Sequence, residues 1–111
     1  RFPEADARAM LADLERAALR DVTSAYDTYE TARAAFLVAT DALVVARENY
    51  RVNEARYQAG SITVIELIQA QNDLTDAESG LVSSRYAARL ALARLEAILG
   101  TRLLHTQGGD Q

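Results

Sequence analysis

The sequence contains no cysteine and no lysine, and it has a single histidine, His105. Without cysteine there can be no disulfide, no thiolate nucleophile and no cysteine-based metal site. One histidine cannot form a zinc-binding cluster, and it has no base or nucleophile partner of its own kind. We therefore expect no cofactor and no metal, and no catalytic residue can be identified. The net charge of −4 argues against a nucleic-acid partner.

Turn-forming residues are also scarce. The chain has five glycines and one proline, and every one of them except Pro3 lies at or after Gly60. An all-β fold or a multi-turn α/β enzyme needs many more turns, so this shortage excludes both classes. No run of roughly 18 apolar residues occurs, so no helix is expected to span a membrane.

The long stretches free of turn residues predict two helices. Pro3 and Glu4 suit the first turn of a helix that covers residues 1–59. Gly60 is expected to end this helix in the left-handed conformation, and residues 60–63 form the tip turn. A second helix is predicted over residues 64–99, where Gly100 is expected to stop it. Residues 100–111 are then expected to be a flexible tail.

Thr63 and Glu66 have the spacing of a capping box at the start of the second helix. In that motif the threonine hydroxyl accepts from the amide of the glutamate, whose carboxylate accepts from the amide of the threonine. Ile62 and Leu67 stand at the staple positions on either side of the cap.

Both predicted helices carry an apolar seam whose members are alternately three and four residues apart, the repeat of a left-handed coiled coil. The seam of the first helix consists of Ala25, Tyr29, Ala32, Phe36, Ala39, Leu43, Ala46, Tyr50, Asn53 and Tyr57. That of the second consists of Leu67, Ala70, Leu74, Ala77, Leu81, Ser84, Ala88, Ala91, Leu95 and Ile98. A short link makes the two helices antiparallel neighbours. The predicted fold is all-α, a long antiparallel helical hairpin.

Two features indicate that this hairpin is part of something larger. The second helix is expected to be about 20 residues shorter than the first, roughly 30 Å, which leaves residues 5–22 without a partner. The first helix also has an apolar flank beside its seam, formed by Val38, Ala42, Val45 and Val52. Such a flank is either a contact with a second neighbouring helix or the wide edge of one core face. We expect the chain to be a fragment of a longer protein.

The tip reads YQAGSITVIELIQAQ over residues 57–71, and Leu99-Gly100-Thr101 follows the second seam. This combination of tyrosine, glycine turn, apolar stretch and Ala-Gln resembles the TolC family of outer-membrane efflux ducts. The resemblance covers nearly the whole chain. The short segment after Gly100 is more similar to the second of the two repeats in each subunit of that family than to the first.

The resemblance implies a homotrimer in which this hairpin is a piece of an α-barrel crossing the periplasm. A β-barrel outside this chain would hold such a protein in the outer membrane. The family works with a periplasmic adaptor and an inner-membrane transporter, in multidrug efflux or type I secretion, to export drugs, metals or proteins. The resemblance implies no chemistry on the exported substrate, so the protein is not expected to be an enzyme. Two alternatives remain open: a cytoplasmic coiled-coil scaffolding or chaperone-like hairpin, and a periplasmic adaptor.

The resemblance also gives roles to residues at the tip. Gly60, Ser61 and Ile62 correspond to the surface on which the adaptor docks, although backbone geometry alone explains the glycine. Ile62 stands where the best-known member has an arginine that helps to latch the closed tip. Tyr57 matches a tyrosine of that gate latch, and it is alternatively the last large side chain of the seam.

Glu66 and Gln69 match two acidic positions that ring the pore constriction in some members of the family. Since Gln69 is not acidic, at most one carboxylate ring is expected. Three copies of Glu66 would form a ring of carboxylates that attracts cations. The alternative for Glu66 is the capping role alone, and the two roles are compatible. Asp73 and Asp76 are expected to lie on a solvated face.

Overall fold

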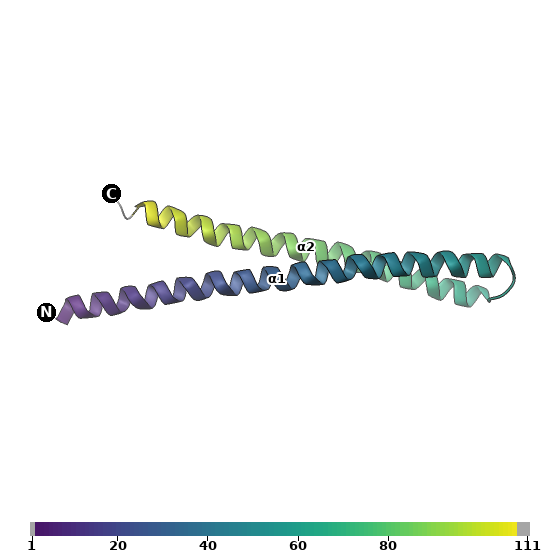
Figure 1. Ribbon diagram of the computed structural model, residues 1–111, viewed down its shortest axis with the longest axis horizontal. Helices are drawn as coiled ribbons and strands as arrows, with labels where there is room; N and C mark the ends of the chain where they lie inside the picture. Colours follow the sequence, from purple (N-terminus) through teal and green to yellow (C-terminus); the bar gives the residue numbers. More distant parts are fainter. Residues whose placement is uncertain (1, 109–111) are drawn as a thin grey trace. The chain divides into compact units, whose positions relative to one another are not determined.

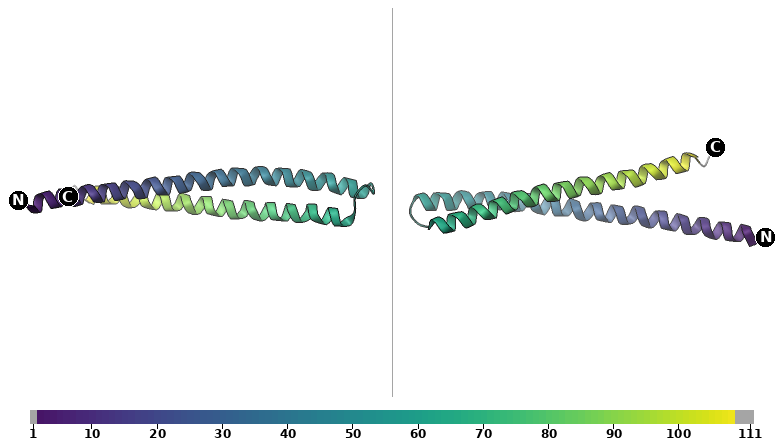
Figure 2. Two further views of the ribbon diagram at one scale, coloured as in Figure 1. Left: turned by 90° about the horizontal axis from the view of Figure 1, so that it is seen from below. Right: turned by 180° about the vertical axis from the view of Figure 1, so that it is seen from behind.

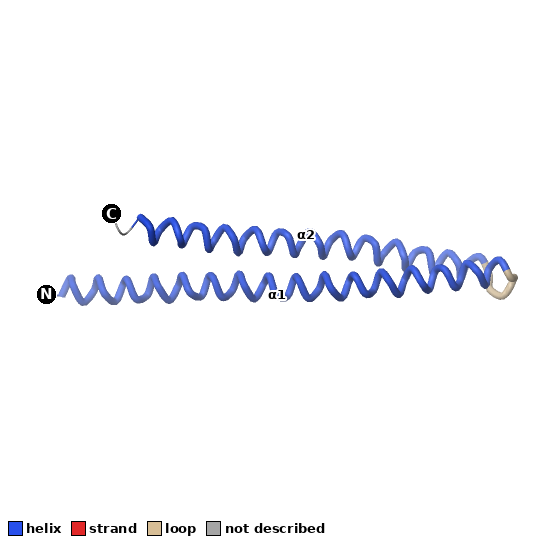
Figure 3. Tube along the Cα trace, turned by 45° about the horizontal axis from the view of Figure 1, so that its top comes forward, coloured by secondary structure: helices blue, strands red, loops and turns tan. Residues whose placement is uncertain are grey.

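The computed structural model describes residues 2–108, which form two helices joined by a short link (Figure 1). Helix α1 spans Phe2–Gln58, 57 residues, and helix α2 spans Val64–Gly108, 45 residues. The described part of the chain contains no strand, and Figure 3 shows the link as its one loop. The predicted all-α hairpin with a single reversal is confirmed; the link occupies residues 59–63, so α1 ends one residue earlier than predicted.

Helix α2 ends later than the sequence indicates, because Gly100 does not stop it. Among the described residues only Gly60 has a positive φ, so Gly100 keeps a helical backbone. Glycine ends a helix by adopting the left-handed conformation; when it remains right-handed the helix continues at a modest energetic cost. Residues 100–108 are therefore helical instead of forming the expected tail. Residues 109–111 and the side chain of His105 lie outside the described part of the structure.

The chain divides into two compact units. The terminal unit consists of Arg1–Glu30 with Leu90–Gln111, and the tip unit consists of Thr31–Arg89. Within the tip unit the end of α1 and the start of α2 run antiparallel and side by side, as the views in Figures 1 and 2 agree. The guanidinium of Arg85 on α2 lies over the ring of Phe36 on α1, 5.9 Å from its centroid, and this contact places the two residues at the same level of the tip unit.

The predicted seams form the core. Every seam position except Tyr57 is buried or half-buried. Leu43 and Ala70 are the buried residues of the tip unit, and Ala91 and Leu95 are those of the terminal unit. The side chain of Tyr57 is 41% exposed, because α1 ends one residue later and the chain turns away.

Two polar residues occupy seam positions, and both form hydrogen bonds within their own helices. The Nδ2 of Asn53 donates to the carbonyl oxygen of Asn49 at 2.8 Å. The hydroxyl of Ser84 donates to the carbonyl oxygen of Leu81 at 3.1 Å. A buried polar group without a partner costs free energy, so these local bonds allow polar side chains at an otherwise apolar interface. In the described part of the chain no buried side-chain nitrogen or oxygen lacks a partner.

The terminal unit contains both covered and uncovered apolar residues. Ala18 and Val22 are half-buried, while Met10, Leu11 and Leu14 are exposed. An open groove of about 700 Å³ in this unit is lined by α1 residues between 18 and 28 and by α2 residues between 91 and 101. Residues 5–22 are thus partnered in part.

The apolar flank of α1 is not covered by α2. Val38 and Val45 are each 68% exposed and Ala42 is exposed, whereas Val52 is half-buried. Apart from Val52 this flank is not an edge of the core between α1 and α2, and it presents a second apolar surface. Neither helix, over the residues described, has a window apolar enough to cross a membrane.

Candidate functional site

The end of α1 is fixed by a Schellman motif centred on Gly60, whose φ is +78°. The amide of Ser61 donates to the carbonyl oxygen of Arg56 at 2.8 Å, and that of Gly60 donates to the carbonyl of Tyr57 at 3.0 Å. These two bonds define the motif, and its glycine position is left-handed. Gly60 therefore sets the direction in which the chain leaves α1.

The start of α2 is fixed by the predicted capping box, which is confirmed. The amide of Glu66 donates to the Thr63 hydroxyl at 3.3 Å, and the amide of Thr63 donates to Oε2 of Glu66 at 3.4 Å. The Thr63 carbonyl accepts the first helical bond, from the amide of Leu67 at 3.2 Å. Ile62 and Leu67, the staple residues, are both half-buried.

The structure places the proposed docking and latch residues on the same short segment. Ser61 and Gly60 are exposed, Ile62 is half-buried, and Tyr57 lies one helical turn before the glycine with its side chain partly in solvent. The carbonyl of Tyr57 contributes to the turn, while its ring extends beyond the end of the core.

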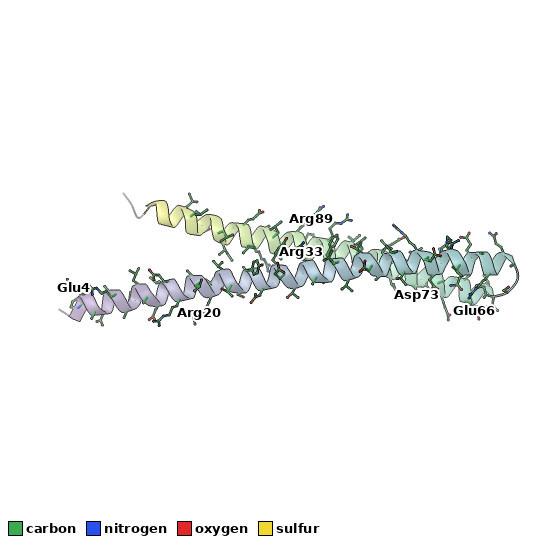
Figure 4. All side chains as sticks on the ribbon, viewed as in Figure 1. Glu4, Arg20, Arg33, Glu66, Asp73 and Arg89 are labelled. Atoms are coloured by element: carbon green, nitrogen blue, oxygen red, sulfur yellow. The ribbon has the colours of Figure 1, made fainter. Side chains whose placement is uncertain are left out.

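Glu66 and Gln69 are exposed and lie one turn apart on α2. Asp73 and Asp76 continue the same three-and-four spacing and are also exposed, and Figure 4 shows Glu66 and Asp73 on one side of the helix. Among the described residues, no group of three or more histidine, aspartate or glutamate side chains is placed to hold a metal ion. The three-and-four spacing places the carboxylates of Glu66, Asp73 and Asp76 in a row along the helix.

Sequence reasoning missed an apolar surface at the first turn of α2. Val64, Ile65 and Ile68, which we call the tip patch, are exposed, and Ile65 is 66% exposed. Their spacing of one, three and four residues places them on neighbouring positions of one helix face. The signal was present in the sequence, since none of the three belongs to the seam that contains Leu67 and Ala70.

An ion pair lies on α1 close to the tip. Arg51 contacts Glu48 through both oxygens, with Nη2 to Oε1 at 2.6 Å and Nε to Oε2 at 3.0 Å. The hydrogen bond and the charge of Arg51 hold the pKa of Glu48 below its ordinary value, and the pKa of Arg51 is raised in turn. Both side chains are exposed, so the pair neutralises two charges locally and contributes little to the free energy of unfolding.

The tip combines apolar and acidic surface. A rigid turn presents the tip patch on one side of α2 and the row of carboxylates on another. Such a surface can bind a complementary protein, and its carboxylates can attract cations.

A family model described as "Outer membrane efflux protein" matches residues 4–101, which include the link and most of both helices. No curated protein and no solved structure matches the chain.

Proposed function

The chain belongs to the outer membrane efflux protein family, and from this membership we propose that its two helices form part of the periplasmic wall of an export duct. The observation that carries the proposal is the match over residues 4–101, which spans the helical hairpin almost from end to end. Drugs, metals or proteins are the classes of substrate that such a duct would export.

The proposed duct is a homotrimer that works with a periplasmic adaptor and an inner-membrane transporter. A helix in a closed wall needs two lateral neighbours. The exposed flank at Val38 and Val45 supports this arrangement, because the core between α1 and α2 does not cover it.

We assign adaptor docking to the tip, at Gly60, Ser61 and Ile62. The Schellman turn gives this segment a defined shape, and the neighbouring tip patch adds exposed apolar surface of the kind that protein interfaces bury. Tyr57 is proposed as a latch residue, since its exposed ring is positioned to reach a neighbouring helix.

We assign the pore constriction to Glu66, with Gln69 as a neutral neighbour one turn further along α2. Three copies of Glu66 around a threefold axis would produce a carboxylate ring at the end of the duct. The capping bond uses one carboxylate oxygen, so capping and ring formation are compatible.

The test is export by the full-length protein in a strain that depends on it. Gly60→Val should abolish export while the protein remains stably expressed and inserted, because a β-branched residue resists the left-handed conformation. Gly60→Asn is the matched control and should retain most of the export, since asparagine tolerates that conformation. Normal export by a stably expressed Gly60→Val protein would contradict the docking proposal.

A further inference from the structure

Three arginines lie at one level of the tip unit, well away from the turn. Arg33 lies on α1, and Arg85 and Arg89 lie one turn apart on α2; all three are exposed. The contact between Arg85 and Phe36 shows that these parts of α2 and α1 lie at one level, and Figure 4 shows Arg33 and Arg89 at the same position along the hairpin. Three positive charges thus lie at the level of the Arg85–Phe36 contact.

None of these arginines is neutralised by a neighbouring carboxylate in the described part of the chain. The ion pairs found among residues 2–108 join Arg16 to Asp13 and Arg51 to Glu48. The whole sequence carries 16 acidic residues against 12 basic ones. A cluster of three unpaired arginines on an acidic chain is therefore a local exception to its charge balance.

Exposed apolar side chains stand beside the arginines. Leu37 lies one turn from Arg33 on α1, and Val82 and Tyr86 occupy the same face of α2 as Arg85 and Arg89. Val82 is 67% exposed and Tyr86 is 69% exposed. We call these six residues the arginine patch; its row on α2 follows the spacing of three and four residues over about 10 Å, two turns of a helix.

One arginine of the patch is already held in place. The guanidinium of Arg85 lies over the Phe36 ring, and this cation–π contact restrains a side chain that would otherwise be mobile. A restrained guanidinium loses less conformational freedom when it binds a carboxylate, and its planar fork matches both carboxylate oxygens.

We propose that the arginine patch binds an amphipathic helix of another protein that carries carboxylates beside an apolar stripe. The unpaired guanidiniums complement the carboxylates, and Leu37, Val82 and Tyr86 complement the apolar stripe. Tyrosine and arginine are also among the residue types enriched at the energetically important positions of protein interfaces. The net charge of −4 disfavours a nucleic acid as the occupant, because the rest of the surface would repel it.

The test uses the 111-residue chain and a labelled alanine-based helical peptide with glutamate and leucine on adjacent faces. Binding is measured by fluorescence anisotropy. The double variant Arg33→Gln/Arg89→Gln should weaken binding at least about tenfold, which corresponds to about 1.4 kcal/mol. The matched control Arg47→Gln/Arg56→Gln removes two positive charges elsewhere in the tip unit and should leave binding within about twofold. Arg33→Lys/Arg89→Lys should give an intermediate loss, because lysine keeps the charge without the fork.

Circular dichroism of each variant checks that the helices are intact; because Arg33 and Arg89 are exposed, their replacement should not unfold them. Failure of the acidic peptide to bind would overturn the proposal. So would equal binding of a peptide with glutamine in place of glutamate, because contact would then be apolar only. Tighter binding to phosphatidylglycerol vesicles than to the peptide would overturn it in favour of a membrane surface. None of these outcomes bears on export, so this inference and the proposed function can fail separately.

Discussion

The side chains of Thr63 and Glu66 each accept a hydrogen bond in the capping box at the start of α2, yet their replacement should lower the free energy of unfolding by different amounts. Thr63→Ala removes the hydroxyl that accepts from the Glu66 amide and should lower the free energy of unfolding by about 1 kcal/mol. Glu66→Gln should cost less, because glutamine also serves in a capping box. Urea unfolding of the chain, followed by circular dichroism, measures both.

Thr75→Ala is the control for this comparison. Thr75 is exposed within α2 and its hydroxyl bonds to the Gln71 carbonyl, so alanine should be neutral or slightly stabilising there. If Thr75→Ala lowered the free energy of unfolding as much as Thr63→Ala does, the capping hydrogen bond would have no special role in stability.

Glu66→Gln should have a second effect in the full-length channel. If three copies of this carboxylate attract cations at the duct end, the variant should weaken block by divalent cations added from the periplasmic side. Single-channel recording measures this, with Asp76→Asn as the control further up the same face. If block by divalent cations were unchanged while the hairpin became less stable, Glu66 would act as a helix cap only.

The residues whose roles depend on local bonding could be predicted from the sequence. Gly60, Thr63 and Glu66 interact only with neighbours within five positions of the chain, and their spacing specifies those bonds. The arginine patch could not be predicted in this way. Arg33 and Arg89 lie far apart in sequence, and only the register of α1 against α2 brings them to one level.

At the scale of the element, two glycines inside α2 show why helix ends are hard to place. Gly80 and Gly100 both remain helical, and an added Cβ at either would meet nothing within 4 Å. Glycine lowers helix propensity wherever it occurs, but it ends a helix only when the following residues stabilise a turn. After Gly60 the Schellman bonds and the cap at Thr63 supply that stabilisation. After Gly100 the chain continues with Thr101, Leu103 and Leu104 in the helix.

Gly80→Ala tests the cost of glycine within this helix. Since no neighbour would be displaced, the variant should raise the free energy of unfolding by up to about 1 kcal/mol through the higher helix propensity of alanine. Thermal unfolding of the chain provides the measurement. A destabilised variant would indicate that position 80 packs closely against another chain.

The whole molecule exposes more apolar surface than its own two helices can cover. The flank at Val38 and Val45 and the uncovered residues Met10, Leu11 and Leu14 each present large apolar side chains to solvent. Burial of such surface favours association, at roughly 25 cal/mol for each Å² removed from water. The sequence alone indicated this surplus, because both sets lie outside the seams.

We therefore expect the isolated chain to self-associate as its concentration rises, and Val38→Glu/Val45→Glu to shift it toward the monomer. Sedimentation velocity over a range of concentrations measures the change. Asn72→Glu/Ser79→Glu, which adds the same charge at exposed positions of α2, is the control and should associate like the parent chain. Equal association of all three proteins would show that the flank is not an association surface.

The link between the helices has a consequence for the rate at which partners can bind. The amides of Ala59, Gly60, Ser61 and Thr63 all donate to groups of the chain's own helix ends. The tip therefore holds its shape without a neighbouring subunit, and a protein that docks there meets a surface with little conformational entropy left to lose. Association at the tip should then be limited by encounter and orientation, with no slow ordering step before the contact forms.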